Sequence, residues 1–480
     1  MYILAAALVT YFAALKLEDA KNKGQQQLLE ENENAIKNKI KADILAKKKR
    51  ICAAAIIITM GIWIVLKYGN FIIDNVNGVL NILHLRWQIE SLPFVVPLGI
   101  SFYTFHAVGY LIDIYREKYK AEHNFAKYFT FIAFFPHIIQ GPFSRYDLLG
   151  KSMFEKHTFS YDRLCAGCSR ILWGVFKKAV VADKLAIAIT AVLNDYHTYS
   201  GLYIIAAIFF HSIRLYADFV GYMDIVSGVS IILGIDLAKN FNQPYFAKTI
   251  DEFWRRWHIT LGQWFRDYVF YPVSMGKTAQ KIGKWARKKW GPKMGKLVPG
   301  YLALLFVWTA TGLWHGANWT FLIWGYLNMA AILSTMQLTD WYTKIKEKLH
   351  INSEGFVWQA FCIARTFVLV CLFRFFFVAD SVYMALSMYK HAIFDIHLGV
   401  LKNPLGFFIG MRNVEILAAI LGTLIIFIVD VLSDTGKWET VKAKCPMLVK
   451  NLLYAAMVLS ILLIAGGDND LVGGFIYANF

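Results

Sequence analysis

Long apolar runs constrain the fold of this chain more than any other feature of its sequence. A membrane-spanning helix needs about 20 largely apolar residues to cross roughly 30 Å of hydrocarbon. Of the 480 residues, 57% are hydrophobic and 17% are charged, and the mean hydropathy is +0.45. Because lipid offers no partner to open backbone groups, the sequence predicts an all-α, polytopic integral membrane protein. The apolar runs in the second half of the chain lie at 298–311, 319–337, 356–379, 414–432 and 451–466.

The first fifty residues consist of an apolar segment followed by a polar one. Residues 1–17 are apolar and lack a basic start, so we expect a retained N-terminal membrane segment rather than a cleaved signal peptide. Residues 18–50 are polar and end in four consecutive basic residues, which predicts a cytoplasmic insertion. The expected membrane domain covers 51–480, with its core at about 90–337.

The net charge of +17 does not require a nucleic-acid partner, because Lys and Arg accumulate in the cytoplasmic loops of membrane proteins. The strongest basic segment, 275–296, carries eight Lys or Arg residues and no acid, which predicts a cytoplasmic loop. Such a loop can contact anionic lipid or a phosphorylated donor, and the sequence leaves both open.

Several kinds of site are missing from the sequence. Cys165 and Cys168 form a CxxC pair, but no second pair of ligands follows at zinc-site spacing, so we expect no bound metal. The chain has no GxSxG nucleophile elbow, no HExxH metal helix and no GxGxxG dinucleotide turn. The six cysteines do not indicate a disulfide framework.

Ionisable side chains recur inside the apolar segments, where each must pair, face a cavity or carry function. Arg214 and Asp218 are four residues apart in the run 201–235, which predicts a helical ion pair. His106 follows Pro93 and Pro97 in an interrupted segment, and we expect a hydrogen-bonded core histidine there.

His315 lies in the stretch Gly312–Trp319, which joins two apolar runs and therefore sits at or near membrane depth. A histidine there has the chemistry to take a proton from a hydroxyl near neutral pH. Gly312 and Gly316 allow close approach of backbones or of a substrate. By itself this stretch is equally compatible with a histidine that merely hydrogen-bonds two helices.

A second histidine lies in an aromatic segment, 251–273. Trp254, His258, Leu261 and Phe265 follow helical spacing, so the segment predicts one amphipathic helix at the interface or along a funnel.

These stretches together resemble the membrane-bound O-acyltransferase (MBOAT) family, in the branch that O-acetylates alginate, cellulose and peptidoglycan. The resemblance rests on motifs spread over the chain after about residue 90. They are Pro97–Phe105, Phe134–Pro136 with Gly141-Pro142, Asp218–Asp224, Asn240–Tyr245, Glu252–Tyr268 and Gly312–Trp319. The chain departs from the family by its long 18–50 insertion, by fewer hydrophobic segments at its start, and by His137 where Gln is usual.

The resemblance implies a ring of roughly ten transmembrane or re-entrant helices around a central tunnel. It implies an O-acyltransferase of the plasma membrane that takes an acetyl group from cytoplasmic acetyl-CoA. It also implies an SGNH-type extracytoplasmic acetyltransferase as partner and a polysaccharide as final acceptor. The matching family residues are His315, the essential histidine, and His258, the second one.

We therefore expect His315 to act as general base on an acceptor hydroxyl, and His258 to orient a substrate or polarise the thioester. Arg255 and Arg256 suit contacts with CoA phosphates, although interfacial snorkelling explains them equally well. Further tunnel candidates, for which ordinary packing is the alternative, are Trp254, Trp257, Trp264, Trp314, Asn318 and Asn242.

Two other functions remain open at this point. A sister branch transfers D-alanine from a carrier protein toward teichoic acid. A transporter or scaffold that uses His315 and His258 as a polar relay would not be an enzyme at all.

Overall fold

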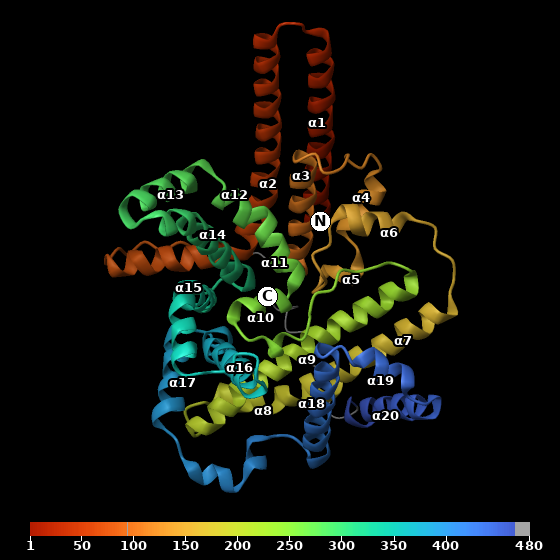
Figure 1. The fold of residues 1–480 in the computed structure, drawn as a ribbon, viewed down its shortest axis with the longest axis vertical. Coiled ribbons are helices and arrows are strands. Elements are labelled where there is room, and N and C mark those ends of the chain that lie inside the picture. Colours follow the sequence, from red (N-terminus) through yellow and green to blue (C-terminus); the bar gives the residue numbers. More distant parts are fainter. Residues whose placement is uncertain (94, 466–480) are drawn as a thin grey trace. The chain divides into compact units, whose positions relative to one another are not determined.

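The computed structural model describes residues 1–93 and 95–465, and this part of the chain contains helices and no strand (Figure 1). Seven of the described helices are long and apolar enough to cross a membrane. The all-α, multi-span fold is thus confirmed, whereas a count of ten is not reached and the ring around a tunnel stays a prediction. The seven are α2 (Asn34–Ile82), α9 (Gly201–Leu233), α14 (Pro292–His315), α15 (Trp319–Lys348), α16 (Phe356–Val378), α18 (Asn413–Asp434) and α20 (Met447–Ala465).

The chain forms two compact units. The first comprises Met1–Phe159 with Leu233–Ala238, and the second comprises Ser160–Ile232 with the chain from Lys239 onward. In the first unit, α1 (Tyr2–Glu30) and α2 form the long antiparallel hairpin drawn in red in Figure 1. The predicted boundary at residue 17 falls inside α1, and α1 is not among the seven candidate spans, so the membrane segment 1–17 stays a prediction.

The helix α3 (Ile100–Tyr115) packs against both arms of this hairpin. His106 in α3 is buried, and its Nδ1 lies 2.7 Å from the Phe102 carbonyl oxygen. Its Nε2 accepts a hydrogen bond of 3.1 Å from the Ser144 backbone N–H. The expected core histidine is therefore confirmed. The rest of the unit holds α4 (Phe125–Ile132), α5 (Phe135–Ile138), η1 (Tyr146–Gly150) and α6 (Lys151–Phe154).

The second unit begins with α7 (Tyr161–Phe176), the π-helical turn η2 (Lys177–Ala182) and α8 (Asp183–Asn194). Asp218 in α9 lies 3.2 Å from the ammonium of Lys178, which also pairs with Asp183. The ion pair between Arg214 and Asp218 stays a prediction, whereas Lys178 is a partner of Asp218 that was not predicted. Because helical spacing cannot report on neighbouring helices, the sequence could not identify this partner.

The single amphipathic helix predicted for 251–273 is also wrong. The structure breaks it into α10 (Ile250–Arg256), α11 (Ile259–Phe265), η4 (Arg266–Phe270) and α12 (Tyr271–Ser274). His258 stands between the first two with φ of 47° and ψ of 51°, a left-handed conformation that no helix interior tolerates. The break turns His258 away from the continuous face that periodicity assigned to it.

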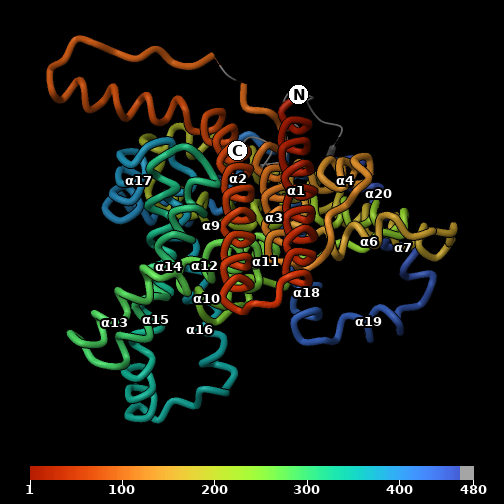
Figure 2. Tube along the Cα trace, turned by 90° about the horizontal axis from the view of Figure 1, so that it is seen from above, coloured from red at the N-terminus to blue at the C-terminus, as the bar shows by residue number. Residues whose placement is uncertain are grey.

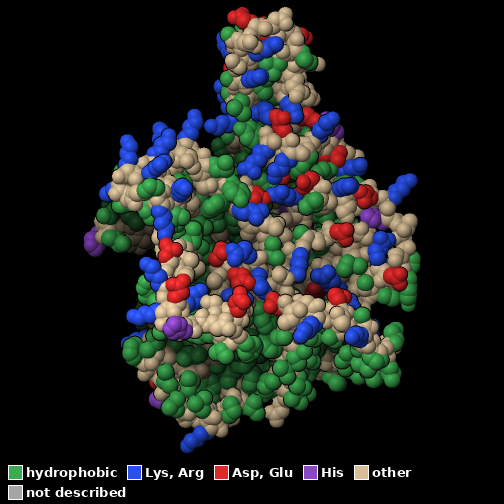
Figure 3. All heavy atoms as spheres, viewed as in Figure 1, with side chains coloured by type: hydrophobic (Ala, Val, Ile, Leu, Met, Phe, Trp, Pro, Cys, Tyr) green, Lys and Arg blue, Asp and Glu red, His purple; other side chains and the backbone are tan. Residues whose placement is uncertain are grey.

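The basic segment predicted as a loop is a helix, α13 (Lys277–Trp290), and Gly291 with φ of 88° separates it from α14. Figure 2 shows α13 folded against α14, and Figure 3 shows its Lys and Arg side chains gathered in blue. The remaining elements are η3 (Pro244–Phe246), α17 (Val382–Phe394), η5 (Leu398–Lys402), η6 (Pro404–Phe407) and α19 (Trp438–Lys444).

Candidate active site

His315 is the last residue of α14, and the chain reverses there into α15. Asn318 begins the second helix, because its side-chain oxygen accepts a 3.0 Å hydrogen bond from the Thr320 backbone N–H. The Asn318 amide nitrogen donates to the Asp380 carbonyl oxygen at 2.7 Å. Asn318 thus serves as a helix cap and a tie to the end of α16, and it does not line the cavity described below.

Two glycines bring the backbones of α14 and α15 together. A Cβ atom on Gly312 would lie 2.7 Å from the Phe321 carbonyl oxygen, and one on Gly325 would lie 2.8 Å from that of Trp308. Real side chains do not tolerate such distances, so both positions need glycine for this crossing. The close backbone approach expected at Gly312 is confirmed, and it holds the end of α14 firmly in place.

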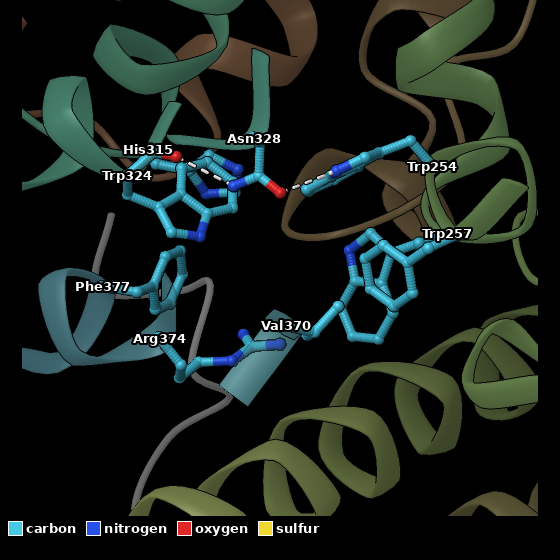
Figure 4. A pocket seen from close by; sticks show the side chains of 9 residues that line it. Trp254, Trp257, His315, Trp324, Asn328, Val370, Arg374 and Phe377 are labelled. Atoms are coloured by element: carbon cyan, nitrogen blue, oxygen red, sulfur yellow. Dashed lines mark hydrogen bonds between the residues drawn. The ribbon is translucent and has the colours of Figure 1, made fainter. Parts of the chain in front are cut away.

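His315 lines a small cavity in the second unit (Figure 4). The cavity measures about 10 Å³, roughly the space of one water molecule, and only 2% of His315 is exposed. The imidazole packs edge-on against Trp324 at 4.8 Å and Phe377 at 5.3 Å between ring centroids. The cavity is therefore small, and aromatic rings pack on the histidine. Its lining comes from α10, α14, α15, α16 and the break after α10, namely Phe253, Trp254, Trp257, His315, Trp324, Asn328, Val370, Arg374 and Phe377.

Asn328 fixes one wall of this cavity. The Trp254 indole N–H donates to the Asn328 side-chain oxygen at 3.0 Å, and the Asn328 amide nitrogen donates to the Trp324 carbonyl oxygen at 2.8 Å. An indole nitrogen only donates and a carbonyl oxygen only accepts, so these two bonds also fix the orientation of the amide. Asn328 thereby locks Trp254 of α10 to α15.

Arg374 completes the polar lining. Only 4% of this residue is exposed, and its guanidinium carbon lies 5.4 Å from the centroid of the Phe377 ring. Sequence analysis did not assign this arginine to the site. It also missed Trp324, Asn328 and Phe377. The general rule on intramembrane charge gave a signal for Arg374, but no feature of the sequence indicated these three residues.

His258 lies outside this cavity lining and has its own support. The Asn240 side-chain oxygen accepts hydrogen bonds from the backbone N–H and the hydroxyl of Thr260, at 3.2 and 2.8 Å. The same oxygen lies 3.2 Å from His258 Nδ1, so Nδ1 carries the proton and Nε2 is the basic nitrogen. Burial lowers the pKa of His258 to about 3, which keeps its ring neutral.

Trp314 connects the two histidines. Its ring centroid lies 4.8 Å from that of His315 and 5.6 Å from that of His258, edge-on in both cases. The residue is buried but does not itself line the cavity. Trp314 thus joins the two histidine sites into one aromatic layer.

The other predicted residues fall in three places. Trp254 and Trp257 line the cavity, whereas Trp264 packs on Phe265 and Tyr268 away from it. Asn242 is exposed, and its side-chain oxygen accepts from the Lys239 ammonium at 2.8 Å.

Arg255 and Arg256 point away from the cavity lining as well. Arg255 is exposed and pairs with Asp251. Arg256 pairs with Glu252 at 2.8 Å and with Asp434 of α18. Burial opposes the charge of Arg256, but these two carboxylates raise its pKa above the usual value. Contacts of either arginine with CoA phosphates stay predictions.

Within residues 1–93 and 95–465, no group of three or more His, Cys, Asp or Glu side chains is placed to hold a metal ion. The cavity itself is lined by an imidazole and a guanidinium among aromatic side chains.

Proteins of similar sequence indicate the family of the chain. Residues 115–286, which include His258, match the model of the MBOAT, membrane-bound O-acyltransferase, family. The probable alginate O-acetylase AlgI of Pseudomonas aeruginosa is 33% identical over 330 residues, which are 68% of this chain and 56% of that protein.

More distant relatives have related names. The peptidoglycan O-acetyltransferase of Helicobacter pylori is 30% identical over 55% of this chain and 51% of its own length. The teichoic acid D-alanyltransferase of Bacillus subtilis is 30% identical over 52% of this chain and 61% of its own length. The chain thus spans about half the length of the curated relatives it matches. By the family match and these relatives, the chain belongs to the membrane-bound O-acyltransferase family.

Proposed function

We propose that this protein is a membrane O-acyltransferase that takes an acetyl group from cytoplasmic acetyl-CoA for the O-acetylation of an extracytoplasmic polysaccharide. The observation that carries the proposal is the placement of His315, which is buried beside a small cavity rich in aromatic side chains, at the turn between two candidate spans. Relatives named as alginate and peptidoglycan O-acetylating enzymes support the acetyl group and the polymer acceptor.

In the proposed step, His315 removes the proton of an acceptor hydroxyl while the hydroxyl oxygen attacks the thioester carbonyl carbon. The carbonyl electron pair moves to its oxygen, and the intermediate collapses with cleavage of the carbon–sulfur bond. The proton on His315 then passes to the departing thiolate, so the imidazole returns to its neutral form. The aromatic walls exclude water, which would otherwise hydrolyse the thioester.

His258 takes a supporting role in this proposal. With its Nδ1–H donated to Asn240, its Nε2 can accept a hydrogen bond from a substrate group or from water on the path to the cavity. Because its pKa is far below 7, His258 acts as a neutral hydrogen-bonding group.

The small volume of the cavity limits how substrates can reach His315. A volume of about 10 Å³ does not admit a thioester and a hydroxyl together, so the walls must open for both. We propose that the donor enters from the side that carries the basic helix α13, in agreement with the positive-inside rule. The acceptor then approaches from the opposite, outer side of the plasma membrane, where an SGNH-type transferase would pass the acetyl group to the polymer.

D-alanyl transfer toward teichoic acid is the second candidate, favoured by the similarity to proteins named teichoic acid D-alanyltransferase. In that case the donor is a carrier protein rather than CoA, and α13 with its many cations would dock an acidic protein surface.

The test is the content of base-labile esters in fractionated envelope and secreted polysaccharides. The strains are wild type, a deletion, and His315→Ala and His315→Gln at equal protein levels. We expect ester acetate to disappear from one fraction in the deletion and in both variants. Loss of D-alanine esters instead would establish the second candidate. Unchanged esters in both His315 variants would refute the general-base role and favour a transporter or scaffold.

A further inference from the structure

Arg374 is a buried cation that has no carboxylate partner among residues 1–93 and 95–465. It lies in α16 with 4% of its surface exposed, and its Nε has no hydrogen-bond partner. Within the part of the chain that the structure describes, no carboxylate lies within 4 Å of its guanidinium. The guanidinium carbon lies 5.4 Å from the centroid of the Phe377 ring.

Other cations of the same unit have a carboxylate or a carbonyl oxygen as partner. Lys177 pairs with Asp224 at 2.6 Å, and Lys184 pairs with Glu415 at 2.9 Å. Arg365 belongs to the same helix as Arg374, and it donates to the Lys248 carbonyl oxygen at 2.6 Å. An ion removed from water without such partners is costly, and a single aromatic face returns only part of that cost. A charge kept in apolar surroundings at this cost is a functional candidate.

The position of Arg374 indicates a role for its charge next to His315. It lines the cavity of His315, and Phe377 contacts both side chains (Figure 4). In Figure 4 the guanidinium extends into the cavity, toward the side formed by Val370 and Trp257. A base and a fixed cation therefore border the same small space, in which no other lining side chain carries a charge.

We propose that the guanidinium of Arg374 binds the carbonyl oxygen of the acyl donor and stabilises the oxyanion that forms on it. This inference rests on the proposed function. When the hydroxyl oxygen bonds to the carbonyl carbon and gives its proton to His315, the carbonyl electron pair becomes a negative charge beside Arg374. When the carbon–sulfur bond breaks, that pair re-forms the carbonyl, and the thiolate leaves with the proton from His315. A charge that appears only during the reaction explains why the described part of the resting chain holds no counterion for it.

The position of Arg374 favours a carbonyl oxygen over the phosphates of the donor. Arg374 and His315 line the same cavity, and the base must lie next to the reacting carbonyl group. A nucleotide with several phosphates needs several cationic or N–H donors, whereas no lining side chain other than Arg374 and His315 can carry a positive charge.

The experiment compares Arg374→Ala, Arg374→Lys and wild type in purified, reconstituted form, with acetyl-CoA and the acceptor varied separately. We expect kcat to fall by about 10²- to 10³-fold in Arg374→Ala, as for loss of an oxyanion-binding group, with little change in KM for acetyl-CoA. Arg374→Lys should retain part of kcat, because it keeps the charge without the planar fork. Added guanidinium should restore activity to Arg374→Ala, whereas urea, which has the same shape without charge, should not.

Arg365→Ala is the matched control, since it removes an arginine of the same helix that serves the backbone of Lys248. Guanidinium should not raise the kcat of this variant. If wild type is active and His315→Ala is not, but Arg374→Ala keeps its kcat, the oxyanion role is wrong while the proposed function stands. A raised KM for acetyl-CoA at unchanged kcat would also overturn it, by making Arg374 a donor-binding cation. Absence of acyl transfer in wild type would refute the proposed function itself.

Discussion

Replacing Asn240 with Ala should loosen the support of His258 and lower the stability of the second unit. Asn240 is 4% exposed, and its side-chain oxygen accepts from Thr260 twice and from His258 once. At about 1 kcal/mol net for each hydrogen bond, the loss is about 3 kcal/mol. The left-handed backbone of His258 adds to the effect, because such a conformation costs about 1–3 kcal/mol unless its surroundings enforce it.

The assay is unfolding of the purified protein in mixed micelles, followed by far-UV circular dichroism as SDS is added. Asn242→Ala is the matched control, since the side-chain oxygen of this exposed asparagine accepts a hydrogen bond from Lys239, and its loss should cost less than about 0.5 kcal/mol. We expect the midpoint of unfolding to drop clearly for Asn240→Ala and to stay near wild type for Asn242→Ala. Equal midpoints for the two variants would show that the hydrogen bonds of Asn240 do not hold His258.

Two further predictions concern pH and helix crossing. The pKa of His258 is about 3 in the folded protein against about 6.5 when unfolded, so only the unfolded state binds this proton between those values. Stability should therefore fall as pH decreases below about 6.5, by about 2 kcal/mol at pH 5 for this group. The loss should be smaller in His258→Asn, and parallel pH curves for both proteins would contradict the assignment. Gly325→Ala should destabilise by about 1–3 kcal/mol, because its Cβ would lie 2.8 Å from the Trp308 carbonyl oxygen. Gly300→Ala, with open space around it in α14, should be neutral or slightly stabilising; equal effects of the two changes on the unfolding midpoint would refute the close-packing argument.

The sequence by itself determined the class of the fold and the identity of the central histidine. Apolar runs of membrane length can only be helices in lipid, so the all-α, multi-span architecture followed from hydropathy. The motif around His315 could be recognised from the sequence because its glycines, aromatic residues and histidine are close together in the chain. The roles of Asn240 and Asn328 could not be predicted from the sequence. Both side chains act through hydrogen bonds to residues 18 and 74 positions away in the chain.

Only the tertiary structure decided which side chains share the cavity with His315. Helical periodicity placed Trp254 and His258 on one face, but the left-handed residue at 258 breaks that helix and sends them to different surroundings. Arg374 is 59 positions from His315 in the chain, and it enters the cavity because α16 packs against α15. Periodicity describes one helix at a time, whereas a site built from four segments depends on how the helices pack, which is fixed by contacts such as Gly312 and Gly325.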